Sequence, residues 1–354
     1  MTPFRLPDRY VQTDECYEGG QGIVWIYQDT DLDRKVAVKF LRPAVQREEL
    51  LQEIASLRAI RYKHVAQIYD LQFHPKTKKP ALIQEYVSGP DLWATTKAGV
   101  TTEQALLILY QIASGISDVH AAGKIHRDIK PTNIKSDAEG IFKLLDFGLT
   151  CDAAPQPSTR QARGTDAFRA PEMYGPSPVP LTPAIDVYAF GVTAWLIFSK
   201  GRIPDELAAI PPQLPAPAFS ILAPTLSLDV SRLLDATLSA SPTARPAMAK
   251  VRRVLADHLL HGKHRALLSE AGGAQQTLLS KPGHAVKLSA GDQFIQISYD
   301  GLTFRIQDAS AGVSINNAPC RVGSVMPESC VITISGDSTR EFYLFDVSHP
   351  EVVL

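Results

Sequence analysis

The segment from residue 124 to residue 148 constrains the fold of this chain more than any other. It reads Lys-Ile-His-Arg-Asp-Ile-Lys-Pro-Thr-Asn, then continues through a short apolar run at residues 141–145 into Asp-Phe-Gly. Asp128, Asn133 and Asp146 are therefore expected beside the ends of short strands. Two carboxylates and an amide provide the hard oxygen ligands that Mg²⁺ prefers, and one carboxylate can receive a hydroxyl proton. The segment predicts a site that combines a bound metal ion with a general base.

Three upstream features point to the same chemistry. Residues 18–25, Glu-Gly-Gly-Gln-Gly-Ile-Val-Trp, lie where a hairpin would join two strands, and glycines there let backbone N–H groups approach phosphate oxygens. Residues 36–40 form an apolar strand that carries one cation, Lys39. Taken singly, the glycine-rich segment could be a plain turn, and Lys39 could be an ordinary lysine at the edge of a sheet. Glu53, however, falls on the apolar face of an expected helix at 47–60. A carboxylate buried there needs a cation as its partner, and Lys39 is the obvious candidate.

The remaining pattern of the first 258 residues predicts a small sheet followed by helices. Strands are expected at residues 22–27, 35–41, 67–73 and 80–87. A helix is expected at 102–122, with a capping box formed by Thr101 and Gln104 and with Gly123 at its end. Thirteen of the 26 prolines lie between Pro171 and Pro246, a density that predicts short helices joined by turns and extended loops.

A second pattern begins after residue 258. Residues 250–265 are basic, and the following stretch rich in Gly, Ala, Gln and Ser predicts a linker at 263–280. Alternating runs then occur, separated by turn residues at 300–301, 316–317 and 336–337. These strand-like runs span residues 294–298, 302–306, 330–334 and 341–347. The tail, residues 281–354, is expected to form a small all-β sandwich.

The order of the motifs resembles that of a known family. A Gly-rich loop, Val-Ala-Val-Lys, a helix Glu, His-Arg-Asp with an Asn five residues later, Asp-Phe-Gly and Ala-Pro-Glu at 170–172 follow one another as in eukaryotic-like (Hanks-type) serine/threonine protein kinases. The resemblance covers residues 10–258. It implies an α+β fold in which a kinase domain at 1–262 has a β-rich N-lobe at about 10–87 and a helical C-lobe at about 91–262.

The resemblance also implies roles for individual residues, with ATP and Mg²⁺, or Mn²⁺, as cofactors. Asp128 would be the catalytic base, with Lys130 near the γ-phosphate, and Lys39 would pair with Glu53 and the α- and β-phosphates. Asn133 and Asp146 would hold the metal. The nucleotide would further contact Gly19, Gly20, Gly22, Val24, Ala37, Glu85, Val87 and Asp91, with Gln84 at the gatekeeper position. In this chain Tyr17 stands where the family has its first loop glycine.

Other matched residues imply support and regulation. Asp186 resembles the aspartate that holds the catalytic-loop backbone, and Arg245 resembles the arginine that pairs with Glu172. Arg127 places a cation beside the base, which a phosphate on the activation loop would neutralise. We expect autophosphorylation at Ser158 or Thr159, with Thr165 as the substrate-loop threonine; a plain solvated loop is the alternative.

Composition and charge exclude several other classes. Thirty-six basic and 37 acidic side chains give a net charge of −1, so no whole-chain field would attract nucleic acid or an anionic membrane. The longest apolar run, residues 189–198, is too short to span a bilayer, and the first residues lack the pattern of a signal peptide. Four scattered cysteines indicate neither a disulfide framework nor a zinc site. A cytoplasmic, compact kinase of bacterial type acting on Ser or Thr of proteins is the expectation.

Two alternatives to an active kinase stay open, a non-catalytic scaffold with a kinase fold and a small-molecule phosphotransferase. The tail resembles a degenerate forkhead-associated domain through residues 288–292, 308–312 and 314–317, yet no arginine for phosphate binding occurs between 266 and 304. Phosphothreonine recognition, autoregulation and binding of another regulatory partner therefore all stay possible for it. Histidines at 258, 261 and 264 favour a basic helix end over a metal site.

Overall fold

The computed structural model of the 354-residue chain divides into two compact units, residues 1–252 and 253–354. It describes residues 6–19, 22–40, 62–74, 79–145, 166–174, 181–209, 212, 218–270, 276–336 and 339–351. The helix expected at 47–60 lies outside the described residues.

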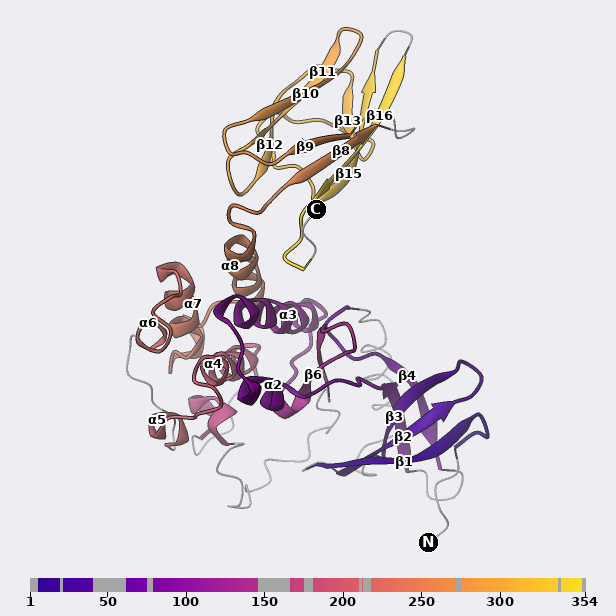
Figure 1. Cartoon of the computed structure of the whole chain (residues 1–354), viewed down its shortest axis with the longest axis vertical. Helices are drawn as coiled ribbons and strands as arrows, with labels where there is room; N and C mark the ends of the chain where they lie inside the picture. The colour runs from indigo at the N-terminus through magenta and orange to yellow at the C-terminus, as the bar shows by residue number, and fades with distance from the viewer. Residues whose placement is uncertain are drawn as a thin grey trace. The chain divides into compact units, whose positions relative to one another are not determined.

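The first unit opens with a five-stranded antiparallel sheet of order β1-β2-β3-β5-β4, visible in Figure 1. Its strands are β1 (Tyr10–Gly19), β2 (Gly22–Asp29), β3 (Arg34–Phe40), β4 (Ile68–Phe73) and β5 (Pro80–Glu85). The strands that the sequence predicts are all present, with ends that move by at most two residues. The sheet is the β-rich N-lobe of the expected fold.

The two faces of this sheet differ in chemistry because side chains alternate along each strand. One face packs Val36, Val38, Ala81 and Ile83 into a core with Leu6, Tyr10 and Tyr27. The strand register places another set of residues on the opposite face, namely Val24, Ile26, Ala37, Lys39, Leu82 and Gln84. This second set, here called the cleft face, carries the residues that the sequence assigns to a nucleotide.

Helices dominate the rest of the first unit, which confirms the expected α+β class (Figure 1). They are α2 (Leu92–Ala98), α3 (Thr102–Ala121), α4 (Ala184–Phe198), α5 (Asp205–Ala208), α6 (Phe219–Leu222), α7 (Leu228–Thr237) and α8 (Met248–Leu260), the last of which crosses the boundary between the units. The short hairpin β6 (Ile134–Ser136) and β7 (Phe142–Leu144) lies between α3 and α4 in the chain, and one-turn 3₁₀ helices span Pro131–Asn133, Asp166–Phe168, Pro171–Tyr174 and Pro242–Ala244.

Local sequence explains the two longest helices. The Thr101 side chain accepts the N–H of Gln104 at 3.2 Å, and the Gln104 side chain accepts the N–H of Thr101 at 2.9 Å, so the predicted capping box of α3 is confirmed. Helix α4 runs for 15 residues because no proline interrupts the chain between Pro183 and Pro204. The proline-rich stretch elsewhere yields the short α5 and α6, as expected.

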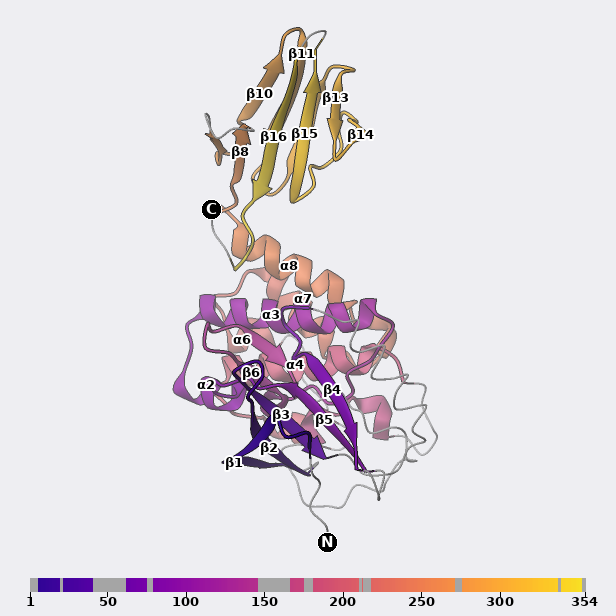
Figure 2. The same cartoon turned by 90° about the vertical axis from the view of Figure 1, so that its right-hand side faces the viewer.

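The second unit is a two-sheet β structure, shown from the side in Figure 2. One sheet has the order β10-β11-β12 and the other β14-β13-β15-β16-β8-β9. Its strands are β8 (Ala266–Glu270), β9 (Gln276–Leu279), β10 (Ala285–Ala290), β11 (Gln293–Tyr299), β12 (Phe304–Ala309), β13 (Val313–Ile315), β14 (Ala318–Pro319), β15 (Ser329–Ser335) and β16 (Arg340–Val347). Residues from both sheets, among them Ile295, Ile332 and Phe345, share one core. The all-β tail that the sequence predicts is thus present.

The stretch 263–280 differs from the linker that the sequence suggests, because it contains strands β8 and β9. Ala266 and Leu268 are buried in the core of the second unit, and β8 pairs with β16 along five residues. Three apolar residues beside a Gly-rich stretch form too short a run to reveal a strand in the sequence. Among the described residues, no helix is both long and apolar enough to cross a membrane.

Candidate functional site

Lys39 is buried on the cleft face of the N-lobe sheet. It lies opposite Val24 of β2 and Leu82 of β5, and only 7% of its surface is exposed. Ala37 and Gln84, also paired across strands, lie two residues further along the same face. A buried ammonium group beside small and apolar side chains offers a cation to an anionic ligand in a site of low polarity. Glu53, the expected partner of Lys39, lies outside the described residues.

The glycine-rich hairpin closes one end of the cleft face. Gly19 and Gly22 form the last residue pair of the β1–β2 ladder, and Gly20 lies outside the described residues. Tyr17, two residues earlier, lies opposite Val24 and places its hydroxyl 3.2 Å from that of Tyr86. The family that the sequence resembles has glycine at this position. Here Tyr17 provides a side chain that contacts Tyr86, the residue after β5.

Side-chain contacts anchor the end of β5 and the segment that follows it. The carboxylate of Glu85 pairs with Lys143 of β7 at 2.5 Å and accepts the N–H of Gln67 at 3.1 Å. Val87 is buried. Asp91 caps α2, because its Oδ1 accepts the N–H of Ala94 at 2.8 Å. The backbone groups of Glu85 and Val87 and the side chain of Asp91 stay predictions as nucleotide contacts.

Asp186 holds the loop that precedes β6. Its Oδ2 accepts the N–H of His126 at 2.8 Å and its Oδ1 accepts the N–H of Arg127 at 2.8 Å. His120, in the last turn of α3, places Nε2 2.8 Å from the same Oδ2. Asp186 is 1% exposed, so the carboxylate is removed from water and uses these donors instead. The α4 helix thereby fixes the backbone on which Asp128 stands.

Asp128 is oriented by two side chains of its own loop. Lys130 Nζ lies 2.9 Å from Asp128 Oδ2, and Asn133 Nδ2 donates to the same oxygen at 2.7 Å. Asn133 Nδ2 also lies 2.9 Å from the Asp128 carbonyl oxygen. The carboxylate is partly exposed, and its bonds to a cation and an amide fix its direction.

The loop also lies against the end of the strand that leads to Asp146. His126 Nε2 lies 3.0 Å from the carbonyl oxygen of Leu145, and the N–H of Leu145 donates to Asn133 O at 2.8 Å. Asp146 itself lies outside the described residues, as do Ser158, Thr159 and Thr165. The structure thus brings Asp128, Lys130 and Asn133 together on a loop that contacts Leu145, the residue before Asp146 in the chain.

Glu172 and Arg245 form a buried ion pair with two parallel bonds. Arg245 donates through its two terminal nitrogens to the two carboxylate oxygens of Glu172, each at 2.7 Å. The Arg245 side chain is fully buried and also donates to the carbonyl oxygens of Ser239 and Ala184. Such a fork holds the 3₁₀ turn Pro171–Tyr174 close to the start of α4.

Sequence reasoning missed His120, Lys143 and Lys135. Each contacts a residue far away in the chain: His120 contacts Asp186, Lys143 contacts Glu85, and Lys135 Nζ lies 5.1 Å from the ring centre of Tyr17. A histidine at a helix end and one lysine in each of two short strands carry no motif of their own. Only the three-dimensional arrangement identifies them.

Comparison with known proteins gives one family model and several relatives that match this chain. The family model described as protein kinase domain matches residues 10–254. The match ends inside α8, so the boundary expected at residue 262 stays a prediction. A serine/threonine-protein kinase named drp72 from Corynebacterium efficiens is 33% identical over 253 residues, which are 64% of this chain and 46% of that protein.

Two further relatives have similar identity to this chain. The serine/threonine-protein kinase PknA of Mycobacterium tuberculosis is 30% identical over 263 residues, covering 68% of this chain and 58% of that protein. Sperm motility kinase 3A of Mus musculus is 31% identical over 255 residues, covering 70% of this chain and 49% of that protein. The chain therefore spans about half the length of the curated relatives it matches.

Proposed function

Because the chain belongs to the protein kinase family, we propose that it transfers the γ-phosphoryl group of ATP to serine and threonine hydroxyls of proteins. The observation that carries this proposal is the fixed carboxylate of Asp128. It is held by Lys130 and Asn133 on a loop whose backbone is anchored by Asp186. A scaffold without catalysis would have no need to orient that carboxylate with a cation and an amide.

In the proposed reaction, Asp128 accepts the proton of the acceptor hydroxyl as the new oxygen–phosphorus bond forms and the bond between the γ-phosphorus and the ADP oxygen breaks. Lys130, 2.9 Å from Asp128, supplies positive charge beside the transferred group. Lys39 binds the α- and β-phosphates from the cleft face, so the leaving ADP stays in place during transfer.

Asn133 fits the role of a metal ligand. It donates to Asp128 through Nδ2, and its Oδ1 is a neutral hard oxygen of the type that Mg²⁺ accepts. We propose Asp146 as the second ligand. When bound, Mg²⁺ neutralises negative charge on the β- and γ-phosphates, and Mn²⁺ has the same ligand preference.

The choice of serine and threonine as acceptors follows from two arguments. Lys130 stands two residues after the base, as in the serine/threonine members of the family that the sequence resembles. In addition, the relatives in Corynebacterium efficiens and Mycobacterium tuberculosis carry serine/threonine-protein kinase in their names. We place this chain in the same substrate class.

We further propose autophosphorylation at Ser158 or Thr159. Arg127 is exposed and adjacent to Asp128 in the chain, and a guanidinium group is a strong partner for phosphate. Mass-spectrometric mapping of an active preparation tests this proposal: phosphate at either residue supports it, and an unmodified segment from Asp146 to Glu172 contradicts it.

For the second unit we propose regulation or partner binding. Its six-stranded sheet exposes Val331, Phe342 and Leu344, which are neighbours in the register of β15 and β16. Two polar residues of its forkhead-associated resemblance are used within the fold: Ser310 bonds the backbone of Phe294, and Asn316 accepts the N–H of Val331. These internal bonds favour a partner other than phosphothreonine.

The acceptor class is tested by incubating the full chain with Mg²⁺, γ-labelled ATP and a mixture of Ser-, Thr- and Tyr-containing peptides. We expect label on Ser and Thr, none on Tyr, and loss of transfer in Lys39→Met. Transfer to a small alcohol but not to peptides would favour a small-molecule phosphotransferase. Nucleotide binding without any transfer would favour a scaffold.

A further inference from the structure

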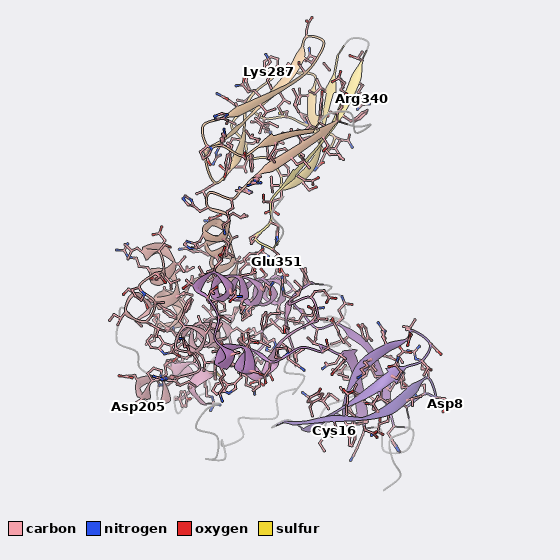
Figure 3. The ribbon with its side chains drawn as sticks, viewed as in Figure 1. Asp8, Cys16, Asp205, Lys287, Arg340 and Glu351 are labelled. Carbon is pink, nitrogen blue, oxygen red and sulfur yellow. The ribbon has the colours of Figure 1, made fainter. Side chains whose placement is uncertain are left out.

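Tyr17 connects three parts of the first unit. It lies on β1 next to Cys16, which is labelled in Figure 3, and nearly half of its surface is exposed. Its hydroxyl lies 3.2 Å from the hydroxyl of Tyr86, in the segment after β5. The ammonium of Lys135, on β6, lies 5.1 Å from the ring centre of Tyr17 and 5.9 Å from that of Tyr86. A single aromatic side chain thus contacts a residue after β5 and a residue of the C-lobe hairpin.

Tyr86 also contacts an ion pair formed by Glu15 and Lys35. The Tyr86 hydroxyl donates to Glu15 Oε2 at 3.4 Å, and Glu15 Oε1 lies 2.5 Å from Lys35 Nζ. Lys35 Nζ lies 5.7 Å from the Tyr86 ring centre. The hydrogen bond to Tyr17, together with burial, raises the pKa of Tyr86 well above its usual value. The Tyr86 phenol therefore remains a neutral hydrogen-bonding partner at physiological pH.

The position of Lys135 places this cluster at the edge of the proposed nucleotide site. Lys135 forms an isolated backbone bridge with Asp91, the residue that we expect at the ribose. Tyr17, in turn, starts the glycine-rich hairpin that we expect over the phosphates. A contact between Tyr17 and Lys135 consequently joins the two borders of the site at its ribose end.

We propose that Tyr17, Tyr86 and Lys135 form a latch that opens whenever a nucleotide enters or leaves, and so slows nucleotide exchange. The inference rests on the proposed function, because it assumes that ATP and ADP occupy the cleft face. An aromatic hydroxyl contact and a stacked cation are weak enough to break within each turnover, yet they are lost together when Tyr17 is replaced.

A latch slows both the association and the dissociation of the nucleotide, and it leaves the Kd nearly unchanged. Stopped-flow fluorescence with N-methylanthraniloyl-ADP measures both rates on the full chain. Tyr17→Leu removes the ring and the hydroxyl, and we expect its association and dissociation rates to rise together by about fivefold to tenfold. Lys135→Met should give a smaller rise in both rates, and Tyr17→Phe, which keeps the ring, should fall between wild type and Tyr17→Leu.

The double variant Tyr17→Leu/Lys135→Met tests whether the two residues act together. If they form one latch, the double variant exchanges nucleotide no faster than Tyr17→Leu alone. Matched controls are Tyr62→Leu, at another exposed tyrosine, and Lys97→Met, which removes the ammonium 5.1 Å from the ring of Trp93 on α2. Both controls should exchange nucleotide at the wild-type rates.

Three results would overturn the latch and are distinguishable from one another. Wild-type rates in Tyr17→Leu and Lys135→Met, with normal binding, contradict the latch and leave the proposed function intact. A faster dissociation with unchanged association assigns Tyr17 to a direct ligand contact instead. Absence of nucleotide binding in the wild type, measured by calorimetry with MgATP, contradicts the proposed function itself.

Discussion

The carboxylate of Asp186 holds Arg127 in a left-handed backbone conformation. Its Oδ1 accepts the Arg127 N–H at 2.8 Å, and φ of Arg127 is +69°. A residue with a side chain adopts this conformation at a cost of about 1–2 kcal/mol, so the buried acceptor must hold it there. Asp128 follows directly, and its direction depends on this turn of the chain.

We predict that Asp186→Asn destabilises the first unit by about 2–3 kcal/mol and lowers kcat at least tenfold. An amide has one acceptor oxygen, so it cannot accept both backbone N–H groups and also contact His120. All three tryptophans lie in the first unit, at 25, 93 and 195, and their fluorescence reports its unfolding in urea. Asp205→Asn, at an exposed acid labelled in Figure 3, is the matched control.

A second prediction concerns the ion pair between Arg245 and Glu172. Arg245→Lys keeps the charge but loses the two parallel bonds and the bonds to Ser239 and Ala184, and we expect a loss of about 2 kcal/mol in unfolding free energy. The control is Arg252→Lys, whose side chain is 42% exposed and contacts Asp118 at 3.2 Å. An equal, small effect in both variants would show that the buried fork does not stabilise the fold.

The cleft face gives a third prediction. Ala37 lies between Ile26 of β2 and Gln84 of β5, on the side of the sheet away from its core. A larger side chain there occupies space needed by a bound base, so Ala37→Ile should raise the Kd for MgATP at least tenfold. Calorimetric titration measures the change, and the unfolding midpoint in urea checks that the variant is folded. Wild-type affinity in a folded variant would place the nucleotide elsewhere.

The sequence predicted the parts of the site whose chemistry is local. Asp128, Asn133 and Lys39 belong to short motifs, and the capping box of α3 is complete within four residues, so each could be recognised without knowing the fold. Strand positions in the N-lobe followed from apolar runs bounded by turn residues. These features need no information about distant segments.

Contacts between distant segments could not be predicted in the same way. Tyr17 and Tyr86 are 69 residues apart, and Lys143 and Glu85 are 58 apart, so no period or motif links them. Strand β8 was not predicted from the sequence because the strand with which it pairs, β16, lies more than 70 residues later. Its three apolar residues can be recognised as part of a strand only once the core of the second unit is known.

A fourth prediction concerns the pH dependence of the second unit. Burial lowers the pKa of His264, which packs against Phe304 and Tyr299 and donates from Nδ1 to Leu302 O at 2.9 Å. The hydrogen bond to Leu302 and the charges of Asp257 and Glu328 oppose this shift in part. In the unfolded chain a histidine has a pKa of about 6.5. The unfolded state therefore takes up the proton first, and stability present above pH 6.5 declines as the pH falls below that value.

Hydrogen exchange of peptides from residues 266–351 at pH 7.5 and pH 5.5 measures this effect. Relative to His264→Phe, the wild type should lose protection at the lower pH, after correction for intrinsic exchange rates. His284→Phe, at an exposed histidine, should follow the wild type. A His264→Phe variant with the same pH dependence as the wild type would contradict the assignment.

The central claim is that the oriented carboxylate of Asp128 promotes phosphoryl transfer. Rapid-quench measurement of a single turnover, with γ-labelled ATP and an accepting Ser/Thr peptide, tests it most directly by comparing the wild type with Asp128→Asn at saturating MgATP. We predict that the transfer rate falls about 10²–10⁴-fold while the Kd for MgATP changes less than about threefold. Equal transfer rates in the two proteins, or equal absence of transfer in both despite bound nucleotide, would contradict the claim.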